Sequence, residues 1–574
     1  MTFVRRSFRE HSFIPFNRNH MIAKHFYSAL VGIIGAGLLF LPATAGAESR
    51  SEANSFGIVP KPFSIEARKE KPFVINADTS IVYQNEASKP AAEYLRERIA
   101  ASTGLQLAVR DSGDANAIVL QVDPERVGFD EKDAYTFKSG GENITITGKS
   151  ASGLFYGIQT LFQLLPPGIY SDTPVADMKL TVDALTIQDK PSMSKIRGLH
   201  VDISRHFRTK EELKKIIDSM AMHKLNTLHL HLSDDEGWRV EIKAYPKLTT
   251  VGAIGNRSDR NAPAAFLTQE DVKELCAYAA QRHVAILPEI DMPGHMGAAI
   301  KSYPELKHPK EERDPAKVIR GDAMGRDFAK KVLTEINSLF DPEYIHLGLD
   351  EVNLRSPVEL YSKAEIIDFA REMTAFVKED LKKTPIVWDD VFVQGFHDKD
   401  AAVHWWRYGH QPFWEKMDIT VDERLNLKQQ PFIFSPAYWT YFDMKNEGEG
   451  RKGGYAGRIS PAEMYNWDPF GDMLGVTPET RQLAHGAIVC TWSEQIPTMK
   501  VFGDRTYPRL ASFSERIWSG GKSENPSILG WVDYRDKVLI PFQLKRYDAL
   551  GLWYWSKDKP ELLETLPDQK KTLN

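Results

Sequence analysis

From Pro191 onward the sequence repeats one pattern, in which a short apolar run is followed by a stretch with helical periodicity. Helices are predicted at residues 210–223, 269–282, 364–381 and 505–518. Strands are predicted at eight runs, residues 196–203, 227–232, 284–289, 344–349, 386–388, 402–406, 432–435 and 487–492. Eight strands that alternate with helices are typical of a closed parallel sheet, so we predict an α/β fold with a TIM-type (β/α)8 barrel over residues 191–555. Residues 438–478 read as a long loop, and such loops are often functional.

The part of the chain before the barrel has a mixed α+β pattern over residues 58–190. Helices are predicted at residues 91–101 and 152–165, and strands at residues 73–75, 80–83, 117–122, 135–138 and 144–148. The sequence of this small domain contains no cluster of potential catalytic side chains, so we expect it to buttress the barrel. A polar tail is expected at residues 556–574.

The N-terminus has the order of a secretory signal peptide. Lys24 and His25 precede an apolar run at residues 26–41, and small residues follow at 43–47. We therefore predict a signal peptide over residues 1–47, with Met21 as an alternative start. The apolar run is short for a membrane span. We expect a mature chain without a membrane span, in the periplasm or outside the cell.

Charge and cysteine content narrow the possible partners and cofactors. The formal net charge of −5 gives no reason to expect nucleic acid or an anionic membrane as a partner. Cys276 and Cys490 lack metal-ligand spacing and are too few for a disulfide framework, so we interpret both as buried thiols. We predict no cofactor and no metal, and the sequence does not indicate an oligomeric state.

Two adjacent carboxylates, Asp350 and Glu351, end the fourth predicted strand. Buried carboxylates are costly without partners, and neighbouring strand residues point to opposite faces. Both acids can face one cavity only where the strand ends and the backbone turns, which is where parallel barrels build active sites. The alternative interpretation is that the pair caps the following helix.

The ends of the other predicted strands carry acids, a few basic side chains and many aromatic rings, all of which would collect at one mouth of the barrel. Aromatic rings cover the apolar faces of a sugar and carboxylates accept hydrogen bonds from its hydroxyls, so this mouth points to carbohydrate. Several residues have a simpler interpretation. Arg205 could merely pair with Asp202 or Asp234, and His295 could be a loop residue. Packing is an equal alternative for Trp238, Trp439 and Trp467.

His229 and His231 share one face of the second predicted strand. They could suggest a metal site, but we interpret them as interior hydrogen-bonded residues.

Four segments resemble motifs of the glycoside hydrolase family 20 β-N-acetylhexosaminidases, in the order of that family. They are residues 197–207 (RGLHVDISRHF), 231–238 (HLSDDEGW), 289–295 (EIDMPGH) and 346–351 (HLGLDE). Residues 58–190 resemble the small α+β domain of the family, including the closing segment 153–165 (GLFYGIQTLFQLL). The sequence departs from the family at Leu349, where a small residue is usual; we expect Leu349 to tighten the packing beneath the acid pair.

The resemblance implies a role for each predicted site residue. Glu351 would be the general acid and then the base that activates water, and Asp350 would hold the N–H of the substrate's 2-acetamido group. Tyr441 would bind the acetamide carbonyl, between walls formed by Trp388, Trp406 and Trp492. Arg205, Asp443 and Glu494 would bind sugar hydroxyls. Asp234, Asp291 and His295 would support Glu351 and Arg205.

The chemistry of the acid pair agrees with the resemblance. Two-carboxylate retaining glycosidases place their carboxyls about 5–5.5 Å apart on opposite sides of the reacting carbon, which adjacent residues do poorly. Adjacent acids suit substrate-assisted catalysis, in which the acetamide oxygen attacks the anomeric carbon. The expected reaction is exo-hydrolysis of terminal β-linked N-acetylglucosamine (GlcNAc) or N-acetylgalactosamine (GalNAc) from oligosaccharides or glycoconjugates, with retention of configuration.

Three alternatives stay open at this point. One is a catalytically silent sugar-binding barrel, and another is a metal-dependent hydrolase that uses His229, His231 and Asp234. The third is a two-carboxylate glycosidase for sugars without an acetamide. Chitin fragments, peptidoglycan fragments and host glycans are all candidate substrates.

Overall fold

The computed structural model describes residues 56–113, 115–407, 425, 428–447, 458–472 and 476–570. The predicted signal peptide lies outside these residues and stays a prediction. None of the helices in the described ranges combines the length and the apolar character that crossing a bilayer requires.

Eight parallel strands close into a barrel in chain order, as predicted. They are β10 (Ile196–Asp202), β11 (Thr227–His231), β12 (Ala285–Met292), β13 (Tyr344–Gly348), β14 (Thr384–Trp388), β15 (Ala402–Trp405), β16 (Phe432–Phe434) and β17 (Ala484–Thr491). β17 pairs with β10 and so closes the ring. All eight predicted runs form strands, with ends that differ by up to three residues.

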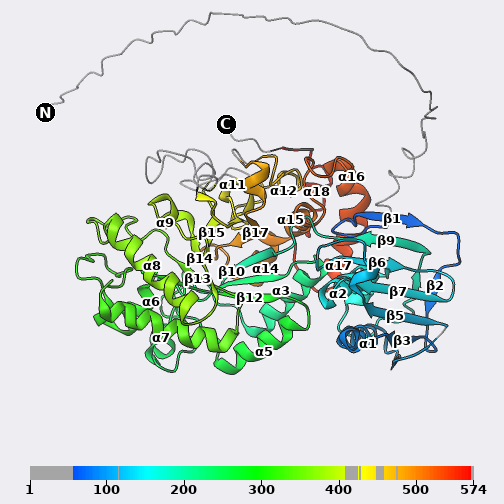
Figure 1. Ribbon diagram of the computed structural model, residues 1–574, viewed down its shortest axis with the longest axis horizontal. Helices are drawn as coiled ribbons and strands as arrows, with labels where there is room; N and C mark the ends of the chain where they lie inside the picture. The colour runs from blue at the N-terminus through cyan, green and yellow to red at the C-terminus, as the bar shows by residue number, and fades with distance from the viewer. Residues whose placement is uncertain are drawn as a thin grey trace, which may run out of the picture. The chain divides into compact units, whose positions relative to one another are not determined.

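Helices cover the outside of the barrel; α5, α7 and α8 are drawn in green in Figure 1. The long ones are α3 (Lys210–Met222), α5 (Gln269–Ala280), α7 (Ala323–Phe340) and α8 (Lys363–Glu379). Thr209 and Thr268 cap α3 and α5: each side chain accepts a hydrogen bond from the backbone N–H three residues further on. The prediction missed α7.

The single helix predicted at residues 505–518 is wrong. The structure has α14 (Met499–Thr506) and α15 (Arg509–Trp518) instead. Tyr507 between them has extended backbone angles, because Pro508 disfavours the helical conformation of the residue before it.

Shorter elements fill the loops and the C-terminal part. The predicted long loop at residues 438–478 contains α12 (Pro461–Tyr465) and is entered from α11 (Ala437–Thr440). The expected polar tail includes α18 (Glu561–Glu564), whose Leu563 is buried. The other short helices are α4 (Lys247–Thr250), α6 (Gly297–Ser302), α9 (Asp389–Val393), α13 (Pro478–Arg481), α16 (Trp531–Tyr534) and α17 (Leu544–Ala549).

The small domain contains a seven-stranded mixed sheet in the order β1-β9-β6-β7-β5-β3-β4 and a separate β2-β8 pair. The predicted strands appear as β2 (Phe73–Ile75), β3 (Ser80–Tyr83), β5 (Ala117–Val122), β6 (Tyr135–Lys138) and β7 (Asn143–Gly148). The prediction missed β1 (Ser64–Ala67), β4 (Ala108–Arg110), β8 (Leu180–Val182) and β9 (Leu185–Asp189). Helices α1 (Lys89–Thr103) and α2 (Ala151–Leu164) pack on the sheet.

Charged side chains buried between the small domain and the barrel join the two. Arg197 of β10 donates to Asp133 Oδ2 at 2.7 Å and to the Tyr156 hydroxyl at 3.2 Å. Lys224, two residues after the end of α3, donates to Asp189 Oδ2 at 2.7 Å. These contacts agree with a buttressing role for the small domain.

The two cysteines differ in burial. Cys490 is buried, as expected, whereas Cys276 on α5 is partly exposed.

Candidate active site

One small pocket at the barrel mouth, about 90 Å³ in volume, brings together every predicted site residue. Most of them follow directly from the carboxyl ends of the barrel strands, where the chain leaves the sheet. The lining residues are Arg205, Asp234, Asp291, His295, Asp350, Glu351, Trp388, Trp406, Tyr441, Asp443, Trp492 and Glu494.

The backbone after β13 explains how adjacent acids reach the same pocket. Gly348, Leu349 and Glu351 have φ angles of 68°, 73° and 51°, so the chain turns in the left-handed region instead of continuing as a strand. The carboxylates of Asp350 and Glu351 consequently both lie near His295 Nε2, each at 3.6 Å. The helix-cap alternative is wrong, because Ser362 caps the next helix, α8.

Leu349 is unusual because a branched residue rarely adopts a positive φ. Its side chain is buried, and its backbone N–H donates to Asp291 Oδ1 at 3.2 Å. At Gly348 a Cβ atom would lie only 1.8 Å from Asp291 Oδ1, so this position cannot hold a side chain.

Asp291 and Asp350 form a hydrogen-bonded carboxyl pair. Burial and the neighbouring Asp350 raise the pKa of Asp291 well above its usual range. Burial raises the pKa of Asp350 to about 7, although His295 opposes the rise. Asp291 therefore keeps the proton of the pair more firmly, and it can donate to an ionised Asp350.

His295 connects Asp350 and Glu351 to Asp234. Its Nδ1 lies 3.2 Å from Asp234 Oδ1, and its Nε2 faces the two acids. Burial lowers the pKa of His295, but Asp234 and the other carboxylates outweigh this and raise it well above the usual value. His295 is therefore a cationic link between carboxylates and not a free loop residue.

Arg205 pairs with both acids that the sequence suggested. Its guanidinium lies 3.2 Å from Asp202 Oδ2, 2.5 Å from Asp234 Oδ2 and 3.5 Å from Glu236 Oε2. It also lines the pocket, so the pairing orients Arg205 towards a ligand and does not remove it from the site.

Three indoles and a phenol form the aromatic walls. The Trp406 and Tyr441 rings lie 6.2 Å apart and nearly parallel, and Trp492 is 5.8 Å from Trp388 and 6.2 Å from Tyr441. Two of the indoles donate hydrogen bonds to carboxylates outside the pocket lining: Trp388 Nε1 to Glu289 Oε1 and Trp406 Nε1 to Asp390 Oδ2, both at 2.9 Å. Trp238, Trp439 and Trp467 are buried away from the pocket and pack in the core.

Clustered donor atoms raise the question of a metal. His200, His231 and Glu289 place ligand atoms within 4.8 Å of one another, as do Asp234, Asp291 and His295. His231 lies between Glu289 and Asp234, at 2.8 and 2.9 Å, and these carboxylates raise its pKa to about 10 against the effect of burial. Both nitrogens of His231 are thus engaged by carboxylates. His231 is an interior hydrogen-bonded residue, as predicted. His229 is also interior, but the prediction that it is hydrogen-bonded is wrong: its Nε2 lies 2.9 Å from Glu289 Oε2 without hydrogen-bond geometry.

Comparison with known proteins identifies the family. The family model "Glycosyl hydrolase family 20, catalytic domain" matches residues 195–521, and "Glycosyl hydrolase family 20, domain 2" matches residues 55–190. The chain belongs to glycosyl hydrolase family 20.

Relatives in family 20 extend over most of the chain. It is 31% identical to the β-hexosaminidase of Porphyromonas gingivalis, over 80% of this chain and 60% of that protein's length. Identity to the β-N-acetylhexosaminidase of Cellulomonas fimi is 29%, over 87% of this chain and 96% of the relative.

Solved family 20 structures are also similar. A Streptomyces coelicolor A3(2) β-N-acetylhexosaminidase gives a TM-score of 0.74 at 28% identity and covers 88% of this chain and 98% of its own. A mutant Streptomyces plicatus β-hexosaminidase in complex with the product GlcNAc gives a TM-score of 0.74 at 29% identity. The match covers 90% of this chain and 98% of that one. This chain is therefore a glycoside hydrolase.

Sequence reasoning about this family 20 chain missed the residues directly behind the pocket. Asp390 and Glu289 hold the indoles, and Arg407 donates to Asp389 Oδ1 at 2.6 Å and to Asp390 Oδ1 at 2.9 Å. The run Trp388-Asp389-Asp390 at a strand end was an available signal. The partners of its carboxylates become visible only in three dimensions.

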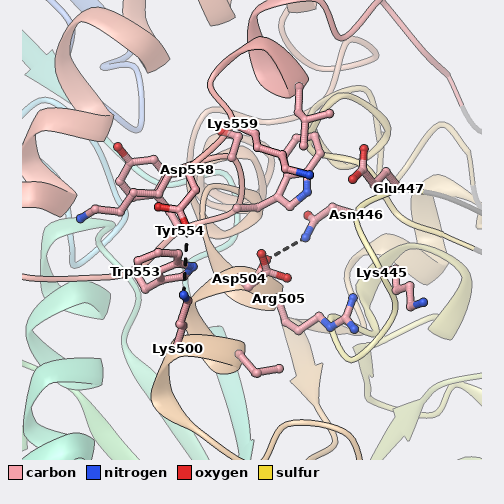
Figure 2. A pocket seen from close by; sticks show the side chains of 15 residues that line it. Lys445, Asn446, Glu447, Lys500, Asp504, Arg505, Trp553, Tyr554, Asp558 and Lys559 are labelled. Atoms are coloured by element: carbon pink, nitrogen blue, oxygen red, sulfur yellow. Dashed lines mark hydrogen bonds and ion pairs between the residues drawn. The ribbon is translucent and has the colours of Figure 1, made fainter.

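A larger cavity of about 680 Å³ lies between α14 and the C-terminal residues 553–562 (Figure 2). Its charged side chains have both signs, and one pair, Lys500 and Asp558, lies 4.0 Å apart. The Lys500 ammonium also covers the Trp553 ring at 3.9 Å from the centroid. None of the predicted site residues lines this cavity, so we assign the chemistry to the smaller pocket.

Proposed function

We propose that this chain is an exo-acting β-N-acetylhexosaminidase that releases terminal β-linked GlcNAc or GalNAc with retention of configuration. The supporting observation is that the left-handed turn after β13 directs Asp350 and Glu351 into one pocket, from neighbouring positions. Two carboxyls arranged in this way do not flank a sugar ring, so the nucleophile comes from the substrate's acetamide.

The acetamide is expected to lie among Trp388, Trp406 and Trp492, with its carbonyl accepting from Tyr441. Flat indole walls restrict the acetamide to orientations in which its oxygen faces the anomeric carbon. A well-oriented intramolecular attack can lower the barrier by about 7–11 kcal/mol. Ionised Asp350 accepts the acetamide N–H and stabilises the positive charge of the oxazolinium-like intermediate.

Glu351 is expected to protonate the leaving glycosidic oxygen and then to take a proton from the attacking water. Its carboxylate lies 3.6 Å from His295 Nε2, which connects it to Asp234. Arg205, Asp443 and Glu494 bind the hydroxyls of the terminal sugar. The small size of the pocket supports exo-action, because it leaves no room for a run of sugars.

Export is a second part of the proposal and rests on the signal-peptide pattern at residues 1–47. Fractionation of cells that make the full chain, with N-terminal sequencing of the mature protein, tests it. Mature protein confined to the cytoplasm with residues 1–47 retained contradicts export.

Chromogenic aryl β-glycosides of GlcNAc, GalNAc and glucose test the activity. We expect rapid hydrolysis of the two acetamido sugars, little of the glucoside, and a β-configured first product by NMR. An inverted product or equal glucoside turnover overturns the mechanism, and binding without turnover favours the silent barrel. Loss of activity with a chelator supports the metal-dependent alternative. A panel of chitin, peptidoglycan and glycoprotein oligosaccharides then identifies the preferred substrate.

A further inference from the structure

Glu289 of β12 is a fully buried carboxylate beneath the pocket floor. Its Oε1 lies 2.9 Å from Trp388 Nε1 and 3.1 Å from His346 Nδ1. Its Oε2 lies 2.8 Å from His231 Nδ1 and 2.9 Å from His229 Nε2. Trp388 and His231 thus hydrogen-bond to this carboxylate, and the His229 and His346 rings lie against it, although the carboxylate has no direct access to the substrate. An arrangement this costly to desolvate calls for a role beyond packing.

The contact with Trp388 fixes the orientation of a pocket wall. The Trp388 ring stacks on His404, with centroids 4.0 Å apart and an angle of 13° between the planes. His404 is itself anchored, with Nε2 2.5 Å from Ser435 Oγ. Stacking on His404 fixes the plane of the indole, and the bond to Glu289 fixes the direction of its Nε1 edge within that plane. The edge that Trp388 presents to the pocket therefore depends on Glu289.

The contact with His231 connects Glu289 to the catalytic acids. His231 Nε2 lies 2.9 Å from Asp234 Oδ2, and the other oxygen of Asp234 is the one that faces His295. His295 in turn faces Asp350 and Glu351. Positive and negative groups alternate along this series from Glu289 to the acids.

The remaining groups that face Glu289 come from the neighbouring strands. They are the imidazoles of His200 from β10, His229 from β11, His346 from β13 and, one ring further away, His404 from β15. Burial lowers the pKa of His200, His229 and His404, so these rings are neutral. The charge of Glu289 is therefore balanced by His231.

We propose that Glu289 is a positioning residue for the substrate-assisted reaction, which sets the Trp388 wall of the acetamide pocket and, through His231, holds Asp234 and His295 behind the acids. This inference rests on the proposed function. The inference distinguishes Glu289 from residues that touch the sugar. Loss of Glu289 should weaken binding of the cyclised acetamide much more than binding of the uncyclised acetamide in GlcNAc.

The test compares two ligands in Glu289→Gln, a thiazoline analogue of the cyclised sugar and GlcNAc itself. We expect the thiazoline affinity to fall by about 10- to 100-fold, the effect of losing a charged hydrogen bond, and the GlcNAc affinity by less than about 3-fold. The kcat for the aryl GlcNAc substrate should fall more than KM changes. Equal loss for both ligands, or an unchanged ratio of their affinities, overturns the proposal.

A matched control is Asp133→Asn, which also converts a buried, ion-paired carboxylate to an amide, but at the small-domain interface. It should lower stability and leave the ratio of the two affinities unchanged. Trp388→Phe keeps an aromatic ring at this position and the charge of Glu289 but removes the indole N–H, so it should shift the ratio of affinities in the same direction even where Glu289→Gln does not fold. In a protein that already carries Trp388→Phe, Glu289→Gln should then lower the thiazoline affinity by a smaller factor than it does in the wild type.

Failure of the proposed function has a different outcome. In that case the wild-type protein itself does not hydrolyse the aryl GlcNAc substrate or binds the thiazoline no more tightly than GlcNAc.

Discussion

The backbone N–H of Glu351 lies 3.2 Å from Oδ1 of Asp390. The other oxygen of Asp390 accepts from Trp406 Nε1 at 2.9 Å, and Arg407 donates to Oδ1 at 2.9 Å. One side chain thus fixes both the backbone of the expected general acid and one wall of the acetamide pocket. Asp390 therefore fixes the position of Glu351 relative to the Trp406 wall of the acetamide pocket, without direct contact between Glu351 and Trp406.

Asp390→Asn should lower kcat strongly. An amide cannot accept from the indole and from the two other donors at once, so either Glu351 or Trp406 moves. Displacement of a catalytic group by about 1 Å can cost about 100-fold in rate. Steady-state kinetics on an aryl GlcNAc substrate measures the effect. Asp172→Asn, at an exposed ion pair with Arg98, is the control, and equal kinetics of the two variants would contradict the coupling.

Glu351→Gln should affect substrates according to their leaving groups. Acid catalysis contributes about 10²- to 10⁴-fold where the departing oxygen needs a proton, and little where it leaves readily. We therefore expect a severe loss with a GlcNAc disaccharide and a mild loss with a nitrophenyl GlcNAc glycoside. Measurement of kcat/KM across a series of aryl leaving groups tests this. Equal losses along the series would remove Glu351 from acid catalysis.

Asp350→Asn should lose most turnover but gain stability in one pH range. Because the folded pKa of Asp350 is raised to about 7, the folded protein holds a proton that the unfolded chain has lost. Raising the pH from about 4 to about 7 therefore destabilises the wild type, by at most about 4 kcal/mol, whereas the neutral amide escapes this cost. Thermal denaturation at pH 4 and pH 8 should show the variant's advantage only at pH 8. A constant difference in Tm would contradict the assigned pKa.

Leu349 allows a test of backbone strain at the acid turn. Both Leu349→Ala and Leu349→Gly remove buried apolar atoms and should destabilise by about 2–5 kcal/mol. At a φ of 73°, however, glycine lacks the steric cost that alanine keeps. The glycine variant should therefore be about 1 kcal/mol more stable than the alanine variant, the reverse of their order in a helix. Denaturant unfolding of the two variants measures the difference.

Much of the fold could be predicted because local pattern and tertiary environment agree. The barrel strands are buried apolar runs with acids and aromatics at their ends, and so the pocket residues could be found by position alone. The missed strands β1 and β4 are short, partly exposed segments at the edges of the sheet, where no apolar pattern is required. The break at Pro508 could have been predicted from the proline.

Other features depend on contacts that no local pattern carries. Leucine disfavours a positive φ, so the turn at Leu349 opposes its propensity and is imposed by the surrounding structure. Asp390 and Glu289 are ordinary acids in the sequence. The role of Asp390 depends on the indole of Trp406, and the role of Glu289 on the indole of Trp388. In both pairs the indole is distant in sequence from the acid that holds it.

Asp133→Asn should destabilise the protein by about 3–5 kcal/mol, because it leaves the guanidinium of Arg197 buried without its charge partner. Chemical denaturation measures the loss, with the exposed Asp172→Asn as control, for which less than about 1 kcal/mol is expected. Activity at low temperature should be retained, since Asp133 is remote from the pocket lining. Equal stability of the two variants would contradict a structural role for the pair.

The position of Arg197 has a practical consequence for anyone who wishes to truncate this enzyme. The strand that carries Arg197 is the seam at which the first and last strands of the barrel meet. A fragment that starts at Pro191 lacks Asp133, so its barrel would have to close with the Arg197 guanidinium buried and unpaired. The two domains are therefore best handled as one folding unit. A replacement for the small domain would need a carboxylate where Asp133 now contacts Arg197.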